Sequence, residues 1–481
     1  MRALFLATYN MIGPAAKRIL IVLTLGTLSA SAFFIRWENF KHSEKRSIDE
    51  FVYYTLGRQV NDDIADYNTI PYANKLMAQG RPLPEYFTQP LFKHPPLFTW
   101  LIAFSMQLFG VNIASAGYVS LFLGVLMIPL IYCLGSLVAG PLVGMGAAIF
   151  LWLDPVNIIC SQKVWMDTPI AFFILLAAVL FISGIRSRND VLIIFSGIVS
   201  GCAANTKYTG ILITVAFALY AFLYRKDLYR SRAFLFSLIL PALMLVPWIL
   251  WNIGVYGSHA LGVQSILHVE IASKINLLKE RWPLLLALIL FTTAIILLLR
   301  KIARDRQAHQ LSPRHQRLIR IGFLTFLVFL VSEQIRHSLQ FGFIPSHSWM
   351  MGFFADQPPW FYIGRLIEYS LIYLFAFFAL LFPRPRESKE MPFIRLTAGL
   401  ILVFFIAWGN YQSRYILSAI PFLLILGVNV WKDLYERAVQ EEVFGKRILL
   451  KIFIYGILIY TAFRTLNINM LMSYPHNFCY F

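Results

Sequence analysis

The chain has 481 residues, of which 58% are hydrophobic and only 14% are charged, and its mean hydropathy is +0.66. Soluble globular proteins carry about 25% charged residues, so this composition excludes that class and indicates a polytopic membrane protein. The net charge of +18 is divided among short basic clusters between apolar runs, a pattern that sets membrane orientation and gives no sign of a nucleic-acid partner. The four cysteines have no zinc-type spacing, and we interpret them as packing residues.

The amino-terminal segment, residues 1–18, is a short basic leader, and the apolar run 19–35 follows it. This run is predicted to span the membrane. The sequence Ser29-Ala30-Ser31-Ala32 resembles a signal-peptidase site, so a cleaved signal remains the alternative. On either interpretation, the polar residues that follow lie outside.

The long polar loop after this run, 36–94, contains a stretch near 71–77 that predicts a short surface helix. The next apolar stretch, Pro95 to Phe109, is only fifteen residues long, whereas a helical span needs about twenty. We therefore expect 95–109 to lie in the interface or to insert only in part. Together these residues form a first outer loop, 36–112, that contains interfacial helices.

Twelve further apolar runs follow, which makes about thirteen predicted transmembrane helices with the first. No internal repeat and no separate soluble domain is apparent, so we predict an all-α polytopic fold with a single membrane-embedded domain, 1–481. The twelve runs are 113–137, 141–159, 169–185, 191–206, 209–224, 233–255, 283–299, 321–335, 364–382, 392–409, 414–431 and 448–463.

The distribution of basic residues predicts the orientation. If the amino terminus lies inside, the inside segments hold 24 of the 42 lysines and arginines, whereas the short outer connections near 160–168 and 207 hold one each. Positive charge is enriched on the inner side of membrane proteins, so we place the amino terminus inside and the carboxyl terminus outside. A crossing at 95–110 would invert this bias, which is the main argument against it.

Carboxylates beside predicted membrane-embedded ends are the candidates for chemistry. Asp49 and Glu50 follow the first run, and Asp167 precedes another, so all three are predicted to lie on the outer side. An acid followed by Pro169 also fits an ordinary helix start, and Asp49-Glu50 fits a solvated pair at such a start. Two acids at one site can instead divide the work. One accepts a proton from a hydroxyl, and the other holds a divalent cation or stabilises positive charge on a sugar.

Five motifs occur in an order that is similar to the GT-C membrane glycosyltransferases, nearest to the protein O-mannosyltransferases and the bacterial lipid A aminoarabinose transferase. The ordered set covers 20–425. It consists of Asp-Glu-x-x-Tyr-Tyr from Asp49, His-Pro-Pro-Leu-Phe-x-Trp from His94, Met-Asp-Thr-Pro around Asp167, Asn-Thr-Lys-Tyr-Thr-Gly around Lys207, and Arg-Tyr-Ile-Leu-Ser-Ala-Ile-Pro from Arg414.

This resemblance implies transfer of a sugar from a polyprenyl-phosphate donor, with inversion at the sugar carbon, to a lipid, glycan or protein acceptor. It implies that Asp49 and Asp167 are the catalytic acids. Lys93, His94, Lys207 and Arg414 are then the candidates for binding the donor phosphate, because a cation neutralises the charge that develops on this leaving group. Aminoarabinose transferases carry Glu-Lys where this chain has Lys93-His94. This difference places a glutamate metal ligand in doubt.

Glu50 and His268 are the remaining candidates, as supporting residues or ligands of a divalent metal of unknown identity. His268 lies near Glu270 in the predicted outer loop 256–282, where a solvated polar loop is the simpler interpretation. The outer stretch 337–363 matches no family motif.

The expected location is the bacterial inner membrane, with the site on the periplasmic face and in contact with membrane lipids. The alternatives are a transporter or lipid flippase, a non-catalytic scaffold, and a surface-polysaccharide polymerase or ligase. Transporters carry ionisable residues near the middle of their spans. Here the spans are nearly free of them, and Glu333, Arg336, Arg365 and Glu368 lie near span ends.

Overall fold

The computed structural model describes residues 13–41, 47–78, 88–257, 361–384, 387–408, 412–441 and 443–472. The chain divides into two compact units, and most of the smaller one, Trp251–Glu368 and Phe404–Tyr411, lies outside the described residues. The larger unit is formed by Met1–Leu250, Tyr369–Val403 and Gln412–Phe481. It contains every candidate site residue that the structure describes.

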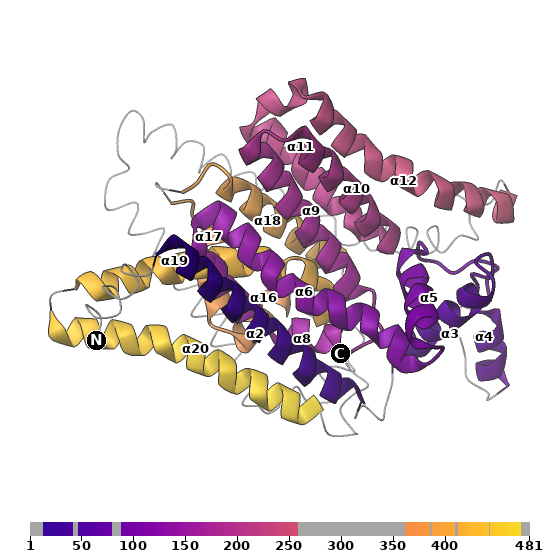
Figure 1. Ribbon diagram of the computed structural model, residues 1–481, viewed down its shortest axis with the longest axis horizontal. Helices are drawn as coiled ribbons and strands as arrows, with labels where there is room; N and C mark the ends of the chain where they lie inside the picture. Colours follow the sequence, from indigo (N-terminus) through magenta and orange to yellow (C-terminus); the bar gives the residue numbers. More distant parts are fainter. Residues whose placement is uncertain are drawn as a thin grey trace. The chain divides into compact units, whose positions relative to one another are not determined.

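All regular secondary structure in the described residues is helical (Figure 1). The amino-terminal half contains α2 (Pro14–Lys41), α3 (Ile48–Asp62), α4 (Ile70–Met77), α5 (Leu97–Phe109), α6 (Ile113–Ala139), α7 (Pro141–Trp152), α8 (Pro155–Ser161), α9 (Asp167–Ser187), α10 (Asp190–Thr206), η2 (Tyr208–Ile211), α11 (Leu212–Tyr224), η3 (Lys226–Arg230) and α12 (Arg232–Tyr256). The carboxyl-terminal part contains α16 (Phe361–Tyr369), α17 (Ile372–Leu381), α18 (Met391–Trp408), η5 (Ser413–Ser418), α19 (Ile420–Gln440) and α20 (Phe444–Met472).

The apolar helices make this a multi-pass membrane protein. Within the described residues, six helices are long and apolar enough to cross a membrane, and the bent pair α7–α8 would make seven. Four shorter apolar helices accompany them: α5, α10, η2–α11 and α17. The predicted runs 283–299 and 321–335 lie outside the described residues, so the expected number of about thirteen spans stays a prediction.

The run predicted as one span at 141–159 is broken, because α7 and α8 meet at an angle of 59°. Asp154 caps α8 by accepting a hydrogen bond from the backbone of Asn157 at 2.9 Å, and Pro155 has no N–H to continue α7. Tyr373 donates to the carboxylate of Asp154 at 2.6 Å, and Thr465 donates to the carbonyl of Leu153. Backbone groups that lose their helical hydrogen bonds at a break inside a membrane need such partners, because no water is available there.

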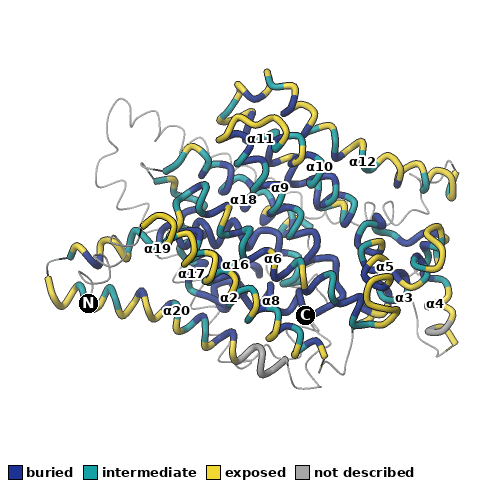
Figure 2. Tube along the Cα trace, viewed as in Figure 1, coloured by how far each residue is buried: buried dark blue, intermediate teal, exposed yellow. Residues whose placement is uncertain are grey.

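The core of the larger unit lies around α9, which packs against α6 and α10. An aromatic cluster fills part of it, with the ring centroids of Phe181 and Phe217 4.1 Å apart and Phe393 5.5 Å from Phe181. Figure 2 shows α9 mostly buried and α6 with few exposed residues, whereas α2, α12 and α20 carry many exposed residues.

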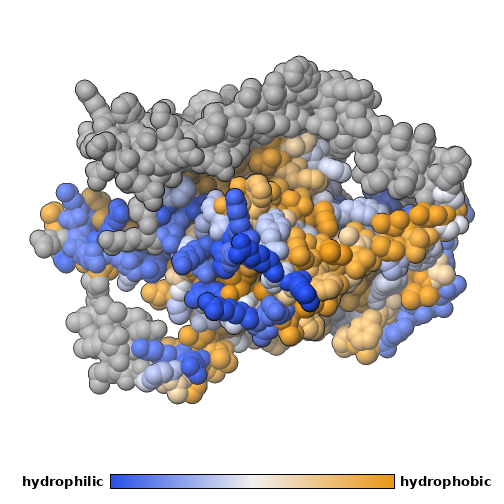
Figure 3. Space-filling model, turned by 90° about the horizontal axis from the view of Figure 1, so that it is seen from above, coloured by the Kyte–Doolittle hydropathy of each residue, from blue (hydrophilic) through white to orange (hydrophobic). Residues whose placement is uncertain are grey.

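The exposed residues of α2, α12 and α20 are largely apolar, including Leu23, Leu250 and Leu449. Figure 3 shows hydrophobic side chains over much of the face that is not drawn in grey, and hydrophilic side chains gathered in separate patches. A hydrocarbon-facing surface has this composition, which agrees with the assignment to a membrane.

Candidate active site

Asp49 and Glu50 occupy the first turn of α3, the helix that opens the first outer loop. Ser47 caps this helix. Its hydroxyl accepts from the backbone N–H of Glu50 at 3.4 Å, and the Glu50 carboxylate accepts from the backbone N–H of Ser47 at 3.0 Å. This reciprocal capping box fixes where α3 begins. It therefore also fixes the direction in which the side chain of Asp49 projects from α3.

Asp167 is the first residue of α9, but its carboxylate does not cap that helix. One oxygen lies 3.4 Å from the ammonium of Lys207, and the other lies 3.7 Å from Nε of Arg414. The side chain is only 5% exposed. The simpler interpretation of Asp167, an acid at an ordinary helix start, does not account for these two cationic partners.

Lys207 follows the last residue of α10 and has an extended backbone, after which η2 turns back. Gly210 makes this turn possible, because a Cβ atom at that position would lie 2.2 Å from the backbone of Ala203. The backbone N–H of Gly210 donates to the carbonyl of Lys207 at 2.8 Å. The ammonium of Lys207 lies 4.3 Å from the centre of the Tyr415 ring, a cation–π contact.

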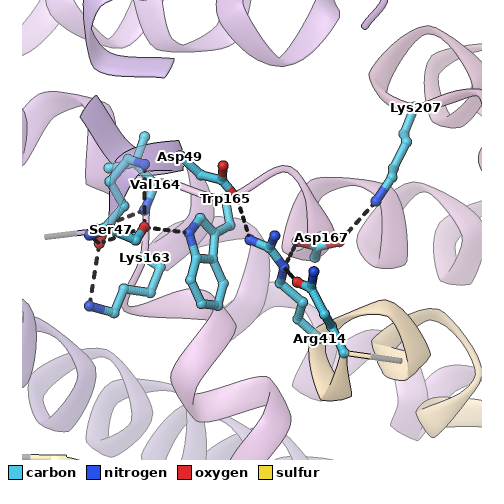
Figure 4. A network of polar contacts seen from close by, with 10 residues as sticks. Ser47, Asp49, Lys163, Val164, Trp165, Asp167, Lys207 and Arg414 are labelled. Carbon is cyan, nitrogen blue, oxygen red and sulfur yellow. Dashed lines mark hydrogen bonds and ion pairs between the residues drawn. The ribbon is translucent and has the colours of Figure 1, made fainter. Parts of the chain in front are cut away.

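Arg414 joins the two acids (Figure 4). It lies in η5, immediately before α19, and its NH1 is 2.7 Å from Oδ2 of Asp49 while its Nε is 3.7 Å from Asp167. Nε also donates to Gln412 at 2.7 Å. The guanidinium carbon lies 4.5 Å from the centre of the Trp165 ring. Four positions far apart in sequence, Asp49, Asp167, Lys207 and Arg414, therefore form one cluster at the ends of helices.

Asp49 is the most accessible acid of this cluster, with 44% of its side chain exposed. Crowding by the surrounding protein would raise the pKa of Asp49. The bound Arg414 guanidinium, with Lys93 and Lys207, outweighs this effect and holds the pKa below its usual value. In Figure 4 the second oxygen of Asp49 points away from Arg414. The cluster thus presents a charged carboxylate with one open oxygen.

Lys93 and His94 stand at the end of the polar loop 36–94, near the same cluster. The hydroxyl of Tyr67 donates to the backbone carbonyl of His94 at 3.0 Å. Burial, together with the positive charges of Lys93, Lys207 and Arg414, holds the pKa of His94 well below its usual value. A neutral imidazole can form a hydrogen bond to a phosphate but adds no charge. Lys93, Lys207 and Arg414 supply the positive charge here.

Glu50 is buried beside a lysine of the loop that precedes Asp167. Its side chain is fully buried and lies 3.3 Å from the ammonium of Lys163, which is 1% exposed. His268 is predicted, like Glu50, to be a supporting or metal-binding residue. It lies outside the described residues.

The acids of the cluster do not fit a divalent cation. No group of three or more His, Cys, Asp or Glu side chains in the described part of the chain lies close enough to hold one. Arg414 already occupies the position between Asp49 and Asp167. Metal sites for hard cations are formed by several oxygen ligands, and here guanidinium and ammonium groups surround the two acids. We therefore derive no step through a metal.

Sequence reasoning missed Trp165, Tyr415 and Lys163 as parts of the site. The ring of Trp165 faces Arg414, the ring of Tyr415 faces Lys207, and Lys163 neutralises Glu50. Trp165 and Lys163 stand two and four residues before Asp167, and Tyr415 stands beside Arg414. Their closeness to the acid and to the arginine was the available signal, but aromatic residues near membrane ends also form ordinary interfacial belts.

Comparison with solved structures defines the class of the fold. The chain has the fold of the GT-C membrane glycosyltransferases, as its motifs predicted. The family profile of the dolichyl-phosphate-mannose-protein mannosyltransferases matches residues 93–251, a segment that includes Lys93, His94, Asp167 and Lys207. A comparison with curated proteins found no match.

Two solved structures illustrate the likeness. The crystal structure of ArnT from Cupriavidus metallidurans bound to undecaprenyl phosphate matches with a TM-score of 0.53 and 14% identity, over 96% of this chain and 76% of that chain. The archaeal oligosaccharyltransferase AglB from Archaeoglobus fulgidus, in complex with an inhibitory peptide and a dolichol-phosphate, matches with a TM-score of 0.52 and 13% identity, over 94% of this chain and 56% of that chain. AglB was also solved with Zn and sulfate.

Proposed function

We propose that this protein transfers a sugar from a polyprenyl-phosphate donor to a hydroxyl of a lipid, glycan or protein acceptor, with inversion at the sugar carbon. The site would lie on the outer face of the membrane, the periplasmic face of a bacterial inner membrane. The observation that carries the proposal is the cluster in which Arg414 joins Asp49 to Asp167 and Lys207 pairs with Asp167. The family profile and the GT-C fold support it.

Asp49 would act as the general base, because it is charged and its side chain is 44% exposed. In the proposed step, the acceptor hydroxyl forms a bond to the sugar carbon as its proton passes to Asp49. The bond between that carbon and the phosphate oxygen breaks, and its electron pair leaves with the lipid phosphate. A positioned base typically contributes about 10²–10⁴-fold in rate.

The basic residues would stabilise the leaving phosphate. Lys207 and Arg414 are 16% and 13% exposed and are held in place by acids and aromatic rings. Lys93 lies close enough to influence the pKa of Asp49. Fixed cations of this kind need no reorganisation as charge develops. Asp167 would orient Lys207 and Arg414, and its negative charge would favour the positive charge that develops on the sugar.

The test uses purified protein in lipid nanodiscs, supplied with undecaprenyl-phosphate-linked sugars and a lipid and glycan extract as acceptor. Release of undecaprenyl phosphate and formation of a glycosylated product are followed by mass spectrometry. We expect both from the wild type and neither from Asp49→Asn. Lipid extracts from cells with and without the gene identify the natural product. Movement of intact donor between leaflets without bond cleavage would reject transfer in favour of a flippase.

A further inference from the structure

A buried ion pair connects the two loops that carry the acids. Glu50 lies in α3, and Lys163 lies in the short segment between α8 and α9. Their side chains are 0% and 1% exposed, and Oε1 of Glu50 is 3.3 Å from Nζ of Lys163. Removing two charges from water costs desolvation free energy. We therefore ask which parts of the chain this buried pair holds in place.

Two hydrogen bonds reinforce the same junction. The backbone N–H of Val164 donates to the second oxygen of Glu50 at 3.3 Å, and the indole N–H of Trp165 donates to the hydroxyl of Ser47 at 3.0 Å. The carboxylate of Glu50 also completes the capping box of α3. Glu50 thus fixes the start of α3 and holds it to Lys163 and Val164, and Ser47 holds it to Trp165.

The junction lies beside the proposed reacting groups. Asp49 precedes Glu50 directly, and Asp167 follows Trp165 by two residues. The indole ring lies 4.5 Å from the Arg414 guanidinium, and the backbone carbonyl of Trp165 accepts from Ser120 of α6 at 3.0 Å. A displacement of α3 relative to 163–165 would therefore separate Asp49 from the Arg414–Asp167 pair.

We propose that Glu50 and Lys163 are positioning residues, which hold Asp49 and Asp167 on either side of Arg414 without touching the substrate. This inference rests on the proposed function of the cluster. It assigns Glu50 a role different from that of a metal ligand or a second base. It also assigns a role to Lys163, which the charge pattern alone marked only as an isolated outer lysine.

The physical consequence of such a pair is asymmetric. Removing one partner takes away a charge that compensates the other buried charge, whereas replacing both with uncharged groups of similar size is often tolerated. Glu50→Gln and Lys163→Met should each disturb the junction, and the double variant should disturb it less. A carboxylate that acts on the substrate would show the opposite pattern, because its function would stay lost when Lys163 is also replaced.

The experiment measures kcat and the donor KM for these three variants in the nanodisc assay. A misplacement of about 1 Å can cost about 100-fold in rate. We expect a loss of that order in kcat for each single variant with a nearly unchanged donor KM, and recovery of most of the activity in the double variant. A double variant as inactive as Glu50→Gln, or single variants as active as the wild type, would overturn the proposal.

Lys432 and Glu436 provide the matched control, because they form a Lys–Glu pair at 3.1 Å with side chains 29% and 51% exposed. Lys432→Met and Glu436→Gln should leave kcat unchanged. Thermal unfolding of the same variants in detergent needs no substrate. If the double variant lost less melting temperature than the single variants while the wild type transferred no sugar, the positioning role of Glu50 and Lys163 would stand and the proposed function would be rejected. If the wild type transferred sugar but the melting temperatures showed no such coupling, the proposed function would stand and the positioning role would be rejected.

Discussion

Asp49 has three features that a general base at this site needs: charge, exposure and an oxygen that does not face Arg414. Asp49→Asn keeps the shape of the side chain but can neither accept the proton nor attract the guanidinium. We expect transfer to fall about 10²–10⁴-fold while the protein stays folded. Kinetics and a thermal melt check this, with Asp62→Asn, an exposed acid in the last turn of the same helix, as the control.

Asp167→Asn should also be severe, because it removes the carboxylate that pairs with Lys207 and one of the two carboxylates that pair with Arg414. The double variant with Asp49→Asn should be little worse than the worse single variant, since residues that act as a unit are not additive. If Asp49→Asn kept more than about a tenth of the wild-type rate, a value well above the expected loss, Asp49 would not be the base.

The pH dependence of the reaction follows from the lowered pKa of Asp49. Asp49 can accept a proton only while it is deprotonated, so we expect the acid limb of kcat/KM to lie below about pH 4. The same lowered pKa stabilises the fold above the unfolded pKa of about 3.9, and this contribution is lost as the pH falls through the folded pKa.

His94 should contribute no ionisation near its usual pKa, because burial and three neighbouring cations keep it neutral. His94→Gln should therefore keep the wild-type pH profile even if the rate falls. A step near pH 6.5, the usual pKa of histidine, that this variant abolished would contradict the assignment.

The two cations of the cluster should affect the donor more than the acceptor. Lys207→Ala and Arg414→Ala each remove a positive group predicted to face the lipid phosphate, so we expect the donor KM to rise more than the acceptor KM. Lys41→Ala, an exposed lysine at the end of α2, is the control. Equal effects on both substrates would return Lys207 and Arg414 to a purely structural role.

At the scale of elements, the turn between α10 and η2 positions Lys207. Gly210→Ala would place a methyl group 2.2 Å from the backbone of Ala203. Overpacking of this kind typically costs about 1–3 kcal/mol, and here it would also displace Lys207. We expect a lower melting temperature and weaker use of the donor.

Gly26→Ala in α2 is the matched control, since its new Cβ would contact nothing within 4 Å. It should leave stability unchanged or raise it by about 0.5–1 kcal/mol, because alanine favours a helix over glycine. If Gly210→Ala behaved in the same way, the close approach of η2 to α10 would not determine the position of Lys207.

The helices were largely predictable from sequence because apolar runs report them directly. The runs 113–137 and 169–185 correspond to α6 and α9. Their interruptions were harder to predict. The run 364–382 is divided at Ser370 between α16 and α17, and 414–431 begins as a 3-10 turn, because local capping and tertiary contacts decide such breaks.

The candidate site was predictable only in part. The motifs selected Asp49, Asp167 and Arg414, but no local pattern shows that Arg414 joins the two acids. Glu50 and Lys163 are 113 positions apart. Their pairing depends on how α3 packs, which one sequence does not reveal.

At the scale of the whole molecule, the orientation remains a prediction from the basic residues. Reporter fusions at Arg188, Arg230, Glu387 and Glu436 should report inside, and a fusion at Asn68 outside. Equivalent fusions at 308 should report inside, and those at 271 and 348 outside, although these positions are not among the described residues. An inside signal from Asn68 would separate the acids from an outer-face donor and remove the basis of the proposed function.

The break between α7 and α8 has a consequence for biosynthesis. The carbonyl of Leu153 receives its hydrogen bond from Thr465, 312 positions later, and Asp154 receives one from Tyr373. A nascent chain inserted up to α12 therefore contains a bent helix whose polar groups still lack these partners. Since α8 leads directly into the segment that carries Lys163 and Asp167, we expect the site to reach its final geometry only after α20 has emerged from the ribosome and docked.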